Sequence, residues 1–350
     1  MDHNQLGPQA LQQLLSAGIE SGAFAECELG TRRQIQAFAL GPTKATRVAK
    51  AAGYVASTYL ITFPASARIS GLVIKVIPLC AERLIADCVQ ERALLHEIYH
   101  ESCSCTLPAQ LAEFELGELR IFVSQLLPGV SATKIIVDTA EARGIAQSIR
   151  DIQRALPQTI TGAALIREAL QAERPYYTRK VRKFLRDFRG LELTAEEVAF
   201  LEPLERVRKS APALVSDRSP ANFVLHEGKV GAFDFGLVLA GVPHEDWSWF
   251  IDDPRLNSSL CRQELLEVFL EDEVSRAVSR GCFHLSAIFV CLKQYSLMYA
   301  LDRHSVAEHY LSRAAESAEA LSLPSAKRLL QKITDSPPAG VRDLKAGGPH

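Results

Sequence analysis

The first region with a clear pattern of apolar and polar positions runs from Thr46 to Pro78. Valine, isoleucine, threonine and tyrosine are frequent in it, and the turn residues of the segment PASAR interrupt it. Runs of β-branched and aromatic residues between turn signals are typical of strands. We therefore expect three short antiparallel strands in this region.

A helix and a hairpin are predicted next. Apolar residues recur at helical spacing between Ala81 and His100, which predicts one amphipathic helix. The segment LAEFELGELRIFVSQLLPG then predicts a hairpin that turns at Gly117. Strands with one inserted helix form a small α+β lobe.

From Asp138 onward the apolar residues recur with a period near 3.6, which predicts helices. The first four are expected at Thr139–Leu156, Ala163–Glu173, Tyr176–Phe188 and Thr194–Lys209. The last of these begins with a TAEE capping box. Strand character returns at Ala213–Val215, and residues 222–235 predict a hairpin that turns at Glu227–Lys229. The remaining helices are expected at Ser258–Ser279, Leu285–Leu301, Val306–Leu321 and Ser325–Ile333.

Together these elements predict an α+β, two-lobed architecture with a cleft between the lobes. We expect a helical extension over residues 1–40, a β-rich lobe with one helix over 41–127, and a helical lobe over 128–334. A hinge near Gln125–Gly129 would join the lobes. Residues 335–350 contain few apolar side chains, so we expect a mobile tail.

Composition narrows the class of protein. The chain has 350 residues, of which 47% are apolar, so it can bury a sizeable core and is neither disordered nor collagen-like. A formal net charge of −2 means that no overall positive charge attracts the protein to nucleic acid or anionic lipid. The first twenty residues lack the pattern of a secretory signal, and Lys293 and Gln294 interrupt the apolar stretch Leu285–Leu301. We expect a soluble, cytoplasmic protein without a disulfide framework, because its eight cysteines show no CxxC spacing.

Three polar residues have a spacing that suggests chemistry. Asp217, Asn222 and Asp234 flank the predicted hairpin in the segment LVSDRSPANFVLHEGKVGAFDFG. An Asp on a loop can accept a proton from a substrate hydroxyl, while a downstream Asn and a second Asp can hold Mg²⁺ against the phosphates of a nucleotide. Each residue could alternatively serve only as a turn former. Their order, with a hairpin between them, favours the chemical interpretation.

A lysine on a strand supports the same interpretation. Lys75 lies among apolar neighbours in GLVIKVIP, and Glu91 follows sixteen residues later on the predicted helix. In nucleotide phosphotransferases a strand lysine contacts the α- and β-phosphates and is held by a helix glutamate. Glu82 and Glu97 are rival partners for this lysine.

With these motifs the sequence resembles the aminoglycoside phosphotransferase and choline kinase-like family, relatives of the protein kinases, over roughly residues 40–320. The resemblance implies a protein kinase-like fold and transfer of the γ-phosphate of ATP to a hydroxyl of a small molecule. It implies the following roles: catalytic base, Asp217; Mg²⁺ ligands, Asn222 and Asp234; ATP orientation, Lys75 and Glu91; phosphate-covering hairpin, residues 51–57 with Gly53; adenine site, Ser124, Gln125 and Leu126. It also assigns Asp246, in GVPHEDWSWF, a structural role in the helical lobe.

Two departures from the family pattern leave an alternative open. Val215 and Ser216 stand where the family usually has His-Gly, and Gly53 is the only glycine of the expected phosphate loop. The alternative is a catalytically inactive pseudokinase that binds a nucleotide or a partner and acts as a regulator.

A second motif suggests different chemistry. His96, Glu97 and His100 form an HExxH pattern on the predicted helix, which places two imidazoles one turn apart as in zinc hydrolases. Cys103 and Cys105 follow, but the sequence offers no obvious fourth ligand for a structural zinc. The pattern also lies within the helix that the kinase interpretation already uses.

Charged segments give conflicting indications about the substrate. Residues 174–190 carry seven Arg or Lys against one Asp. This fits a solvated helix face, or an anionic partner such as a phosphorylated metabolite or RNA. The opposite charge gathers in a set of acidic residues that would suit a cationic, antibiotic-like substrate: Glu245, Asp246, Asp252, Asp253, Glu271, Asp272 and Glu273. The identity of the acceptor stays open.

Overall fold

The computed structural model describes residues 6–40, 47–50, 57–64, 67–98, 104–172, 175–236 and 238–336. Its contacts divide the chain into two compact units. The first consists of Met1–Val130 and Val224–Leu237, and the second of Ser131–Phe223 and Val238–His350. Within the described ranges, no helix has both the length and the hydrophobicity needed to cross a membrane.

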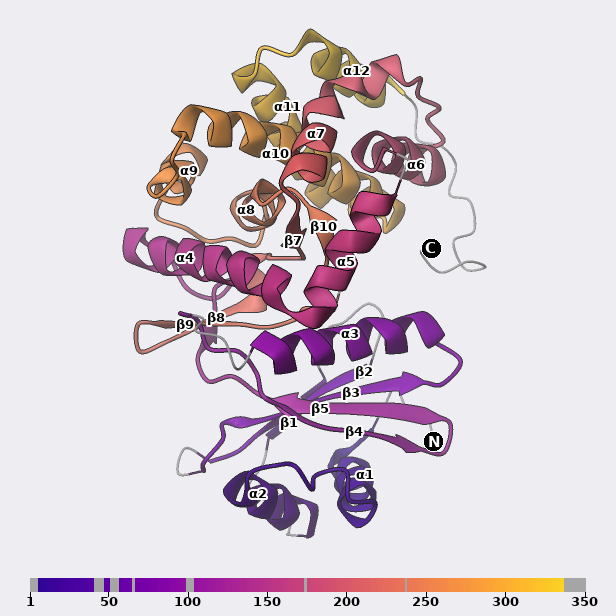
Figure 1. The fold of residues 1–350 in the computed structure, drawn as a ribbon, viewed down its shortest axis with the longest axis vertical. Coiled ribbons are helices and arrows are strands. Elements are labelled where there is room, and N and C mark those ends of the chain that lie inside the picture. Colours follow the sequence, from indigo (N-terminus) through magenta and orange to yellow (C-terminus); the bar gives the residue numbers. More distant parts are fainter. Residues whose placement is uncertain are drawn as a thin grey trace. The chain divides into compact units, whose positions relative to one another are not determined.

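The first unit is built on a five-stranded antiparallel sheet of order β1-β2-β3-β5-β4 (Figure 1). Its strands are β1 (Arg47–Lys50), β2 (Ser57–Thr62), β3 (Gly71–Pro78), β4 (Gln110–Leu116) and β5 (Leu119–Gln125). Gly117 has a left-handed φ of 59° in the turn between β4 and β5, a conformation that glycine adopts without steric cost. The three strands and the hairpin predicted from the sequence are therefore confirmed.

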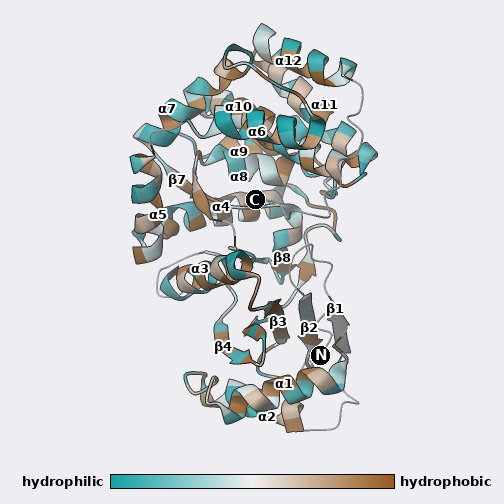
Figure 2. Cartoon of the chain, turned by 90° about the vertical axis from the view of Figure 1, so that its right-hand side faces the viewer, coloured by the Kyte–Doolittle hydropathy of each residue, from teal (hydrophilic) through white to brown (hydrophobic). Residues whose placement is uncertain are grey.

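Helices cover both faces of this sheet. Helix α3 (Glu82–Ile98) lies on one face, and α1 (Pro8–Glu20) with α2 (Leu29–Leu40) on the other (Figure 2). Leu11 and Ile35 of the helix pair are fully buried in one apolar core with the sheet. The expected N-terminal helical segment thus covers an apolar sheet face that would otherwise be exposed to water.

The second unit is largely helical. Its helices are α4 (Thr139–Ala155), α5 (Ile160–Gln171), α6 (Tyr177–Arg189), α7 (Glu202–Ser210), α8 (His244–Ile251), α9 (Arg262–Leu270), α10 (Arg276–Ala300), α11 (His304–Ala320) and α12 (Pro324–Asp335). The apolar core packs around the middle of α10, where Ile288, Phe289 and Cys291 are buried. A short antiparallel pair joins β7 (Ala213–Val215) to β10 (Leu239–Gly241).

A three-stranded sheet of order β6-β8-β9 contains the predicted hairpin. Its strands are β6 (Val130–Ser131), β8 (Phe223–His226) and β9 (Lys229–Ala232). The backbone of Thr106 pairs with Val230 and Ala232 at distances of 2.9 and 3.0 Å. Because of such contacts, Val224–Leu237 belongs to the first unit, whereas the sequence pattern placed this hairpin in the helical region.

The helix predicted at Thr194–Lys209 is two elements in the structure. A 3₁₀ helix spans Glu196–Leu201, and α7 begins at Glu202. Pro203 occupies the first turn of α7, where its missing N–H costs nothing, but inside a longer helix its ring would clash with the preceding turn. The predicted capping box is present, since Thr194 N donates to Glu197 and Glu197 N donates to the Thr194 hydroxyl.

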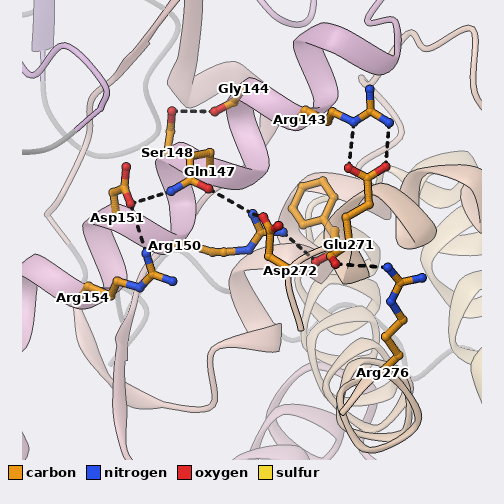
Figure 3. Close-up of polar contacts among 11 residues, drawn as sticks. Arg143, Gly144, Gln147, Ser148, Arg150, Asp151, Arg154, Glu271, Asp272 and Arg276 are labelled. Carbon is orange, nitrogen blue, oxygen red and sulfur yellow. Dashed lines mark hydrogen bonds and ion pairs between the residues drawn. The ribbon is translucent and has the colours of Figure 1, made fainter. Parts of the chain in front are cut away.

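The prediction of a single helix at Ser258–Ser279 is also wrong, because α9 ends at Leu270 and α10 begins at Arg276. Figure 3 shows a polar network between α4 and the α9–α10 turn. Arg143 makes two hydrogen bonds of 2.7 Å to Glu271, and Arg150 donates to Asp272 at 2.8 Å. These tertiary contacts stabilise a turn at a place where the local sequence favours helix.

Candidate active site

Lys75 lies in the middle of the sheet of the first unit. In β3 it pairs with Thr58 on one side and Phe122 on the other. Its Nζ is 2.6 Å from Oε2 of Glu91, a buried residue of α3. Of the three glutamates considered as partners, Glu91 is therefore the one that pairs with Lys75.

Asp234 joins this pair from the chain that follows β9. Its Oδ1 lies 3.9 Å from Lys75 Nζ, and the next backbone N–H, of Phe235, donates to Glu91 Oε1 at 3.0 Å. Asp234 has a left-handed φ of 62°, a conformation that aspartate tolerates better than most residues. Glu91 thus uses one oxygen for the lysine and the other to fix the backbone beside Asp234.

The electrostatics of this cluster keep Lys75 charged. Burial lowers the pKa of Lys75, but the negative charges of Glu91 and Asp234 outweigh this effect and raise the pKa above its ordinary value. The neighbouring Cys88 has its pKa raised to about 12, mainly by burial. At neutral pH Lys75 is therefore an ammonium group and Cys88 an uncharged thiol.

The predicted adenine-binding residues lie at the end of β5 and just beyond it, in the same sheet. Ser124 and Gln125 pair with Val73 and Leu72, and Leu126 N donates to the carbonyl of Gly71 at 2.9 Å. All three side chains of this predicted site are half-buried. Gly53 and residues 51–56 of the predicted phosphate hairpin lie outside the described residues, as do residues 337–350 of the tail.

Asp217 and Asn222 lie together in the second unit, on the loop after β7. The Asn222 side chain donates to the carbonyl of Asp217 at 2.7 Å, and Ser219 N donates to Asp217 Oδ1 at 3.1 Å. The second contact is an Asx turn, so Asp217 is a turn former as well as a candidate base. The two interpretations of this residue are compatible, because the turn fixes the direction of its carboxylate.

The buried carboxylate of Asp246 anchors the backbone just before Asp217. Asp246 of α8 accepts hydrogen bonds from Ser216 N at 2.9 Å and from the Gln153 side chain at 2.7 Å. Burial raises the pKa of Asp246 to about 7, against the opposing effects of Arg218 and these hydrogen bonds. These contacts match the structural role that the family resemblance assigns to Asp246.

Other charged residues near Asp217 were not proposed as site residues from the sequence. Lys293 of α10 and Arg255 each interact electrostatically with Asp217, and so does Tyr310 of α11. They come from segments far apart in the chain, so no motif spacing connects them. The one available signal was Lys293, a charged residue inside an otherwise apolar stretch.

The structure thus brings together two groups of predicted residues. Lys75, Glu91 and Asp234 meet in the first unit, and Asp217 and Asn222 meet in the second. Binding of one Mg²⁺ by Asn222 and Asp234 stays a prediction.

The HExxH hypothesis also stays a prediction. His100 and Cys103 lie outside the described residues, so the motif is described only in part. Among the residues that are described, no group of three or more His, Cys, Asp or Glu side chains could hold a metal ion.

Comparison with known proteins identifies the fold. No family model matches the sequence, and no curated protein matches it. An ADP-bound aminoglycoside phosphotransferase, APH(2'')-Ib, is similar in structure to this chain, with 16% sequence identity and a TM-score of 0.50. The similarity covers 83% of this chain and 97% of the phosphotransferase. An amicoumacin kinase in complex with AMP-PNP and Ca²⁺ matches 83% over 89% of its own, with 14% identity and a TM-score of 0.51. A choline kinase from Cryptosporidium parvum matches 93% over 98% of its own, with 10% identity and a TM-score of 0.50.

The chain therefore has a protein kinase-like fold, in which an antiparallel sheet is followed by a largely helical region. Within that class, it has the fold of the aminoglycoside phosphotransferases and choline kinases. Both the predicted fold class and the predicted resemblance are confirmed.

Proposed function

We propose that this protein is a phosphotransferase that uses ATP and Mg²⁺ to phosphorylate a hydroxyl group of a small molecule. The observation that supports this most directly is the Lys75–Glu91–Asp234 cluster, which combines an ion pair of 2.6 Å with an adjacent carboxylate. Structures of the same fold bind ADP or AMP-PNP with Ca²⁺, which is consistent with a nucleotide site. Fold alone does not determine function, so the proposal depends on these side chains.

On the nucleotide side, the residues of the first unit would orient ATP. Lys75 would contact the α- and β-phosphates, and Glu91 would keep its ammonium group in place. The Asp234 side chain is 54% exposed and has hard oxygen donors, as Mg²⁺ requires, and Asn222 would supply a further oxygen. When bound, the metal ion would neutralise charge on the transferring phosphoryl group. Ser124, Gln125 and Leu126 would bind the adenine, and Gly53 would lie in the loop over the phosphates.

On the acceptor side, Asp217 would orient the hydroxyl group and accept its proton. Its side chain is half-buried, and the Ser219 N–H fixes one carboxylate oxygen. As the bond from the acceptor oxygen to the γ-phosphorus forms, the bond from that phosphorus to the oxygen that bridges it to the β-phosphate would break, and ADP would leave with the electron pair. The proton of the acceptor hydroxyl would pass to the Asp217 carboxylate.

The alternative is an inactive pseudokinase that regulates a partner. The replacement of His-Gly by Val215 and Ser216 favours it. However, Ser216 N is held by Asp246 and the Asp217 carboxylate is oriented by the following turn. The loop is therefore organised despite the departure, which favours the enzyme.

The test is ATP-dependent phosphorylation of a panel of hydroxylated metabolites by the wild type and two variants. Asp217→Asn should reduce kcat by roughly 10²-fold or more, the scale of a lost general base, while ATP affinity stays nearly intact. Asp234→Ala should weaken Mg²⁺-dependent ATP binding and abolish transfer, because the developing charge is no longer neutralised. Asp187→Asn, which changes an exposed carboxylate paired with Arg186, is the matched control.

The outcomes separate the candidate functions. Nucleotide binding without transfer to any acceptor would support the pseudokinase. Equal, metal-independent ATP binding by the wild type and Asp234→Ala would contradict the metal assignment. Stoichiometric zinc that is lost in His96→Ala would instead support the hydrolase.

A further inference from the structure

The acidic residues that would suit a cationic acceptor are all engaged inside the second unit. Each of the seven has an intramolecular partner. The pairs are Glu245 with Tyr177, Asp246 with Gln153, Asp252 with Arg262, Asp253 with Arg255, Glu271 with Arg143, Asp272 with Arg150, and Glu273 with Ser279. Four of the seven, Asp252, Asp253, Glu271 and Asp272, pair with an arginine that compensates their charge, whereas the other three accept hydrogen bonds from neutral groups.

Two of these carboxylates, Asp252 and Asp253, each accept several hydrogen bonds within the second unit. Asp252 is fully buried, accepting from Arg262 at 2.6 Å and from the Ser248 hydroxyl at 2.8 Å. Asp253 receives both the side chain and the backbone N–H of Arg255, at 2.7 to 3.0 Å. Arg255 interacts with Asp217, but its charge is already matched by Asp253.

Lys293 is in the opposite situation. It lies on α10 with Glu245 and Asp217 in its electrostatic environment. Within the part of the chain that the structure describes, no residue forms an ion pair or hydrogen bond with its ammonium group. Its recorded close contact is with the face of the half-buried Trp249 ring, 5.1 Å from the ring centre.

This environment is costly for a lysine. Burial lowers the pKa of Lys293, and the carboxylates of Glu245 and Asp217 oppose this only in part. Lys293 is half-buried, and an ammonium group held partly away from water without a paired anion is less favourable than one in an ion pair. An anionic ligand would supply the missing partner.

We propose that Lys293 binds an anionic group, a carboxylate or a phosphate, of the hydroxylated acceptor beside Asp217. This inference rests on the phosphotransferase function proposed above and assigns its acceptor to the anionic class. The ammonium group of Lys293 would bind the anion, the Trp249 ring would contact the carbon skeleton, and Asp217 would receive the hydroxyl proton. The four carboxylates that pair with arginines are less available to a polycationic acceptor.

The test compares acceptors grouped by charge but matched in skeleton: glycerate and glycerol phosphate, glycerol, and 3-amino-1,2-propanediol, extended by the same classes of larger polyols. Kinetics are measured for the wild type, Lys293→Met, Lys293→Arg and Lys209→Met, which removes an exposed lysine of α7. We expect wild type to prefer anionic acceptors. Lys293→Met should raise KM for these acceptors by roughly 10- to 100-fold, the range for a hydrogen bond to a charged group, with kcat little changed. Lys293→Arg should restore part of the preference, and Lys209→Met should match the wild type.

The melting temperature of the Lys293→Met variant distinguishes an anion-binding lysine from a structural one. Because Lys293 is unpaired, Lys293→Met should melt at or above the wild-type temperature. A large decrease in melting temperature would indicate a structural lysine and overturn the inference.

Other outcomes are equally decisive. Wild type that phosphorylates neutral or cationic acceptors, with Lys293→Met unchanged, would leave the proposed function standing and remove this inference. An equal loss of kcat for every acceptor would place Lys293 on the transferring phosphoryl group instead. Transfer to no acceptor at all would remove the proposed function and this inference with it.

Discussion

The two groups of candidate site residues are held in place by different forces. In the first unit Lys75, Glu91 and Asp234 fix one another through opposite charges. In the second unit Asp217 and Asn222 are positioned by hydrogen bonds to and from the backbone, and Asp246 anchors the loop from a buried position. In the first unit the charged candidate residues also hold the local structure together. In the second unit a different residue, Asp246, does so.

This difference predicts how each group responds to substitution. A charge-neutralising change in the first unit should alter ligand binding and local order together, because the same atoms serve both. In the second unit Asp217 can be changed with little structural effect, whereas a change in its support should destabilise the fold. Stability and function should therefore separate in the second unit only.

The largest expected effect is that of Asp246→Ala. It removes the buried acceptor of both the Ser216 N–H and the Gln153 side chain. A buried donor left without its acceptor costs about 1–3 kcal/mol, and this variant affects two donors. Denaturant unfolding should show this loss, whereas the exposed Asp187→Ala should stay within about 0.5 kcal/mol of the wild type. A small effect for Asp246→Ala would mean that the loop has other support.

Glu91→Gln should have an intermediate effect on nucleotide binding. The amide keeps the size of the side chain but loses the charge that holds Lys75. We expect ATP to bind about 10-fold more weakly, near the lower end for a hydrogen bond to a charged group. Calorimetric titration measures this, with Glu82→Gln as the control on the exposed start of α3. If Asp217→Asn weakened ATP binding as much as Glu91→Gln, the contrast between the two groups would fail.

The last expected effect is a change in the slope of stability with pH. Burial raises the pKa of Asp246 from 3.8 to about 7 and lowers that of His244 from 6.5 to about 4. The folded state binds the Asp246 proton more tightly, so this contribution to stability is lost as pH rises from about 4 to 7. The unfolded state binds the His244 proton more tightly, so that contribution increases over nearly the same range.

Asp246→Asn should therefore unmask the His244 effect. Relative to the wild type, the free energy of unfolding of this variant should increase with pH between about 4 and 7, by at most about 1.4 kcal/mol per pH unit. Urea unfolding at several pH values measures the slope. A parallel pH profile for variant and wild type would show that Asp246 does not titrate abnormally.

Local patterns predicted the elements that depend on local forces. The strand alternation around Lys75 and the hairpin turn at Gly117 depend on neighbouring residues, and both were predicted. The Lys75–Glu91 pair was predicted, with Glu82 and Glu97 as rivals, because nucleotide phosphotransferases pair a strand lysine with a helix glutamate. Asp217 and Asn222 were found because they are close in sequence.

The remaining features depend on distant residues. The break between α9 and α10 depends on Arg143 and Arg150, more than 115 residues earlier in the chain. Helix α8 is short and buried on nearly every side, so it has no amphipathic pattern to detect. The environment of Lys293 is set by packing among segments that no spacing rule connects.

The first unit is formed by two separate segments of the chain, and this affects when it can fold during synthesis. Its hairpin segment, Val224–Leu237, is synthesised about a hundred residues after Val130, the end of the preceding part of that unit. Until the ribosome has released this segment, Thr106 lacks its strand partners and Glu91 lacks the N–H of Phe235. Domains usually fold as they emerge from the ribosome, in order from the N-terminus. Here the Lys75–Glu91–Asp234 cluster must wait, because Ser131–Phe223 of the helical unit emerges before Asp234 does.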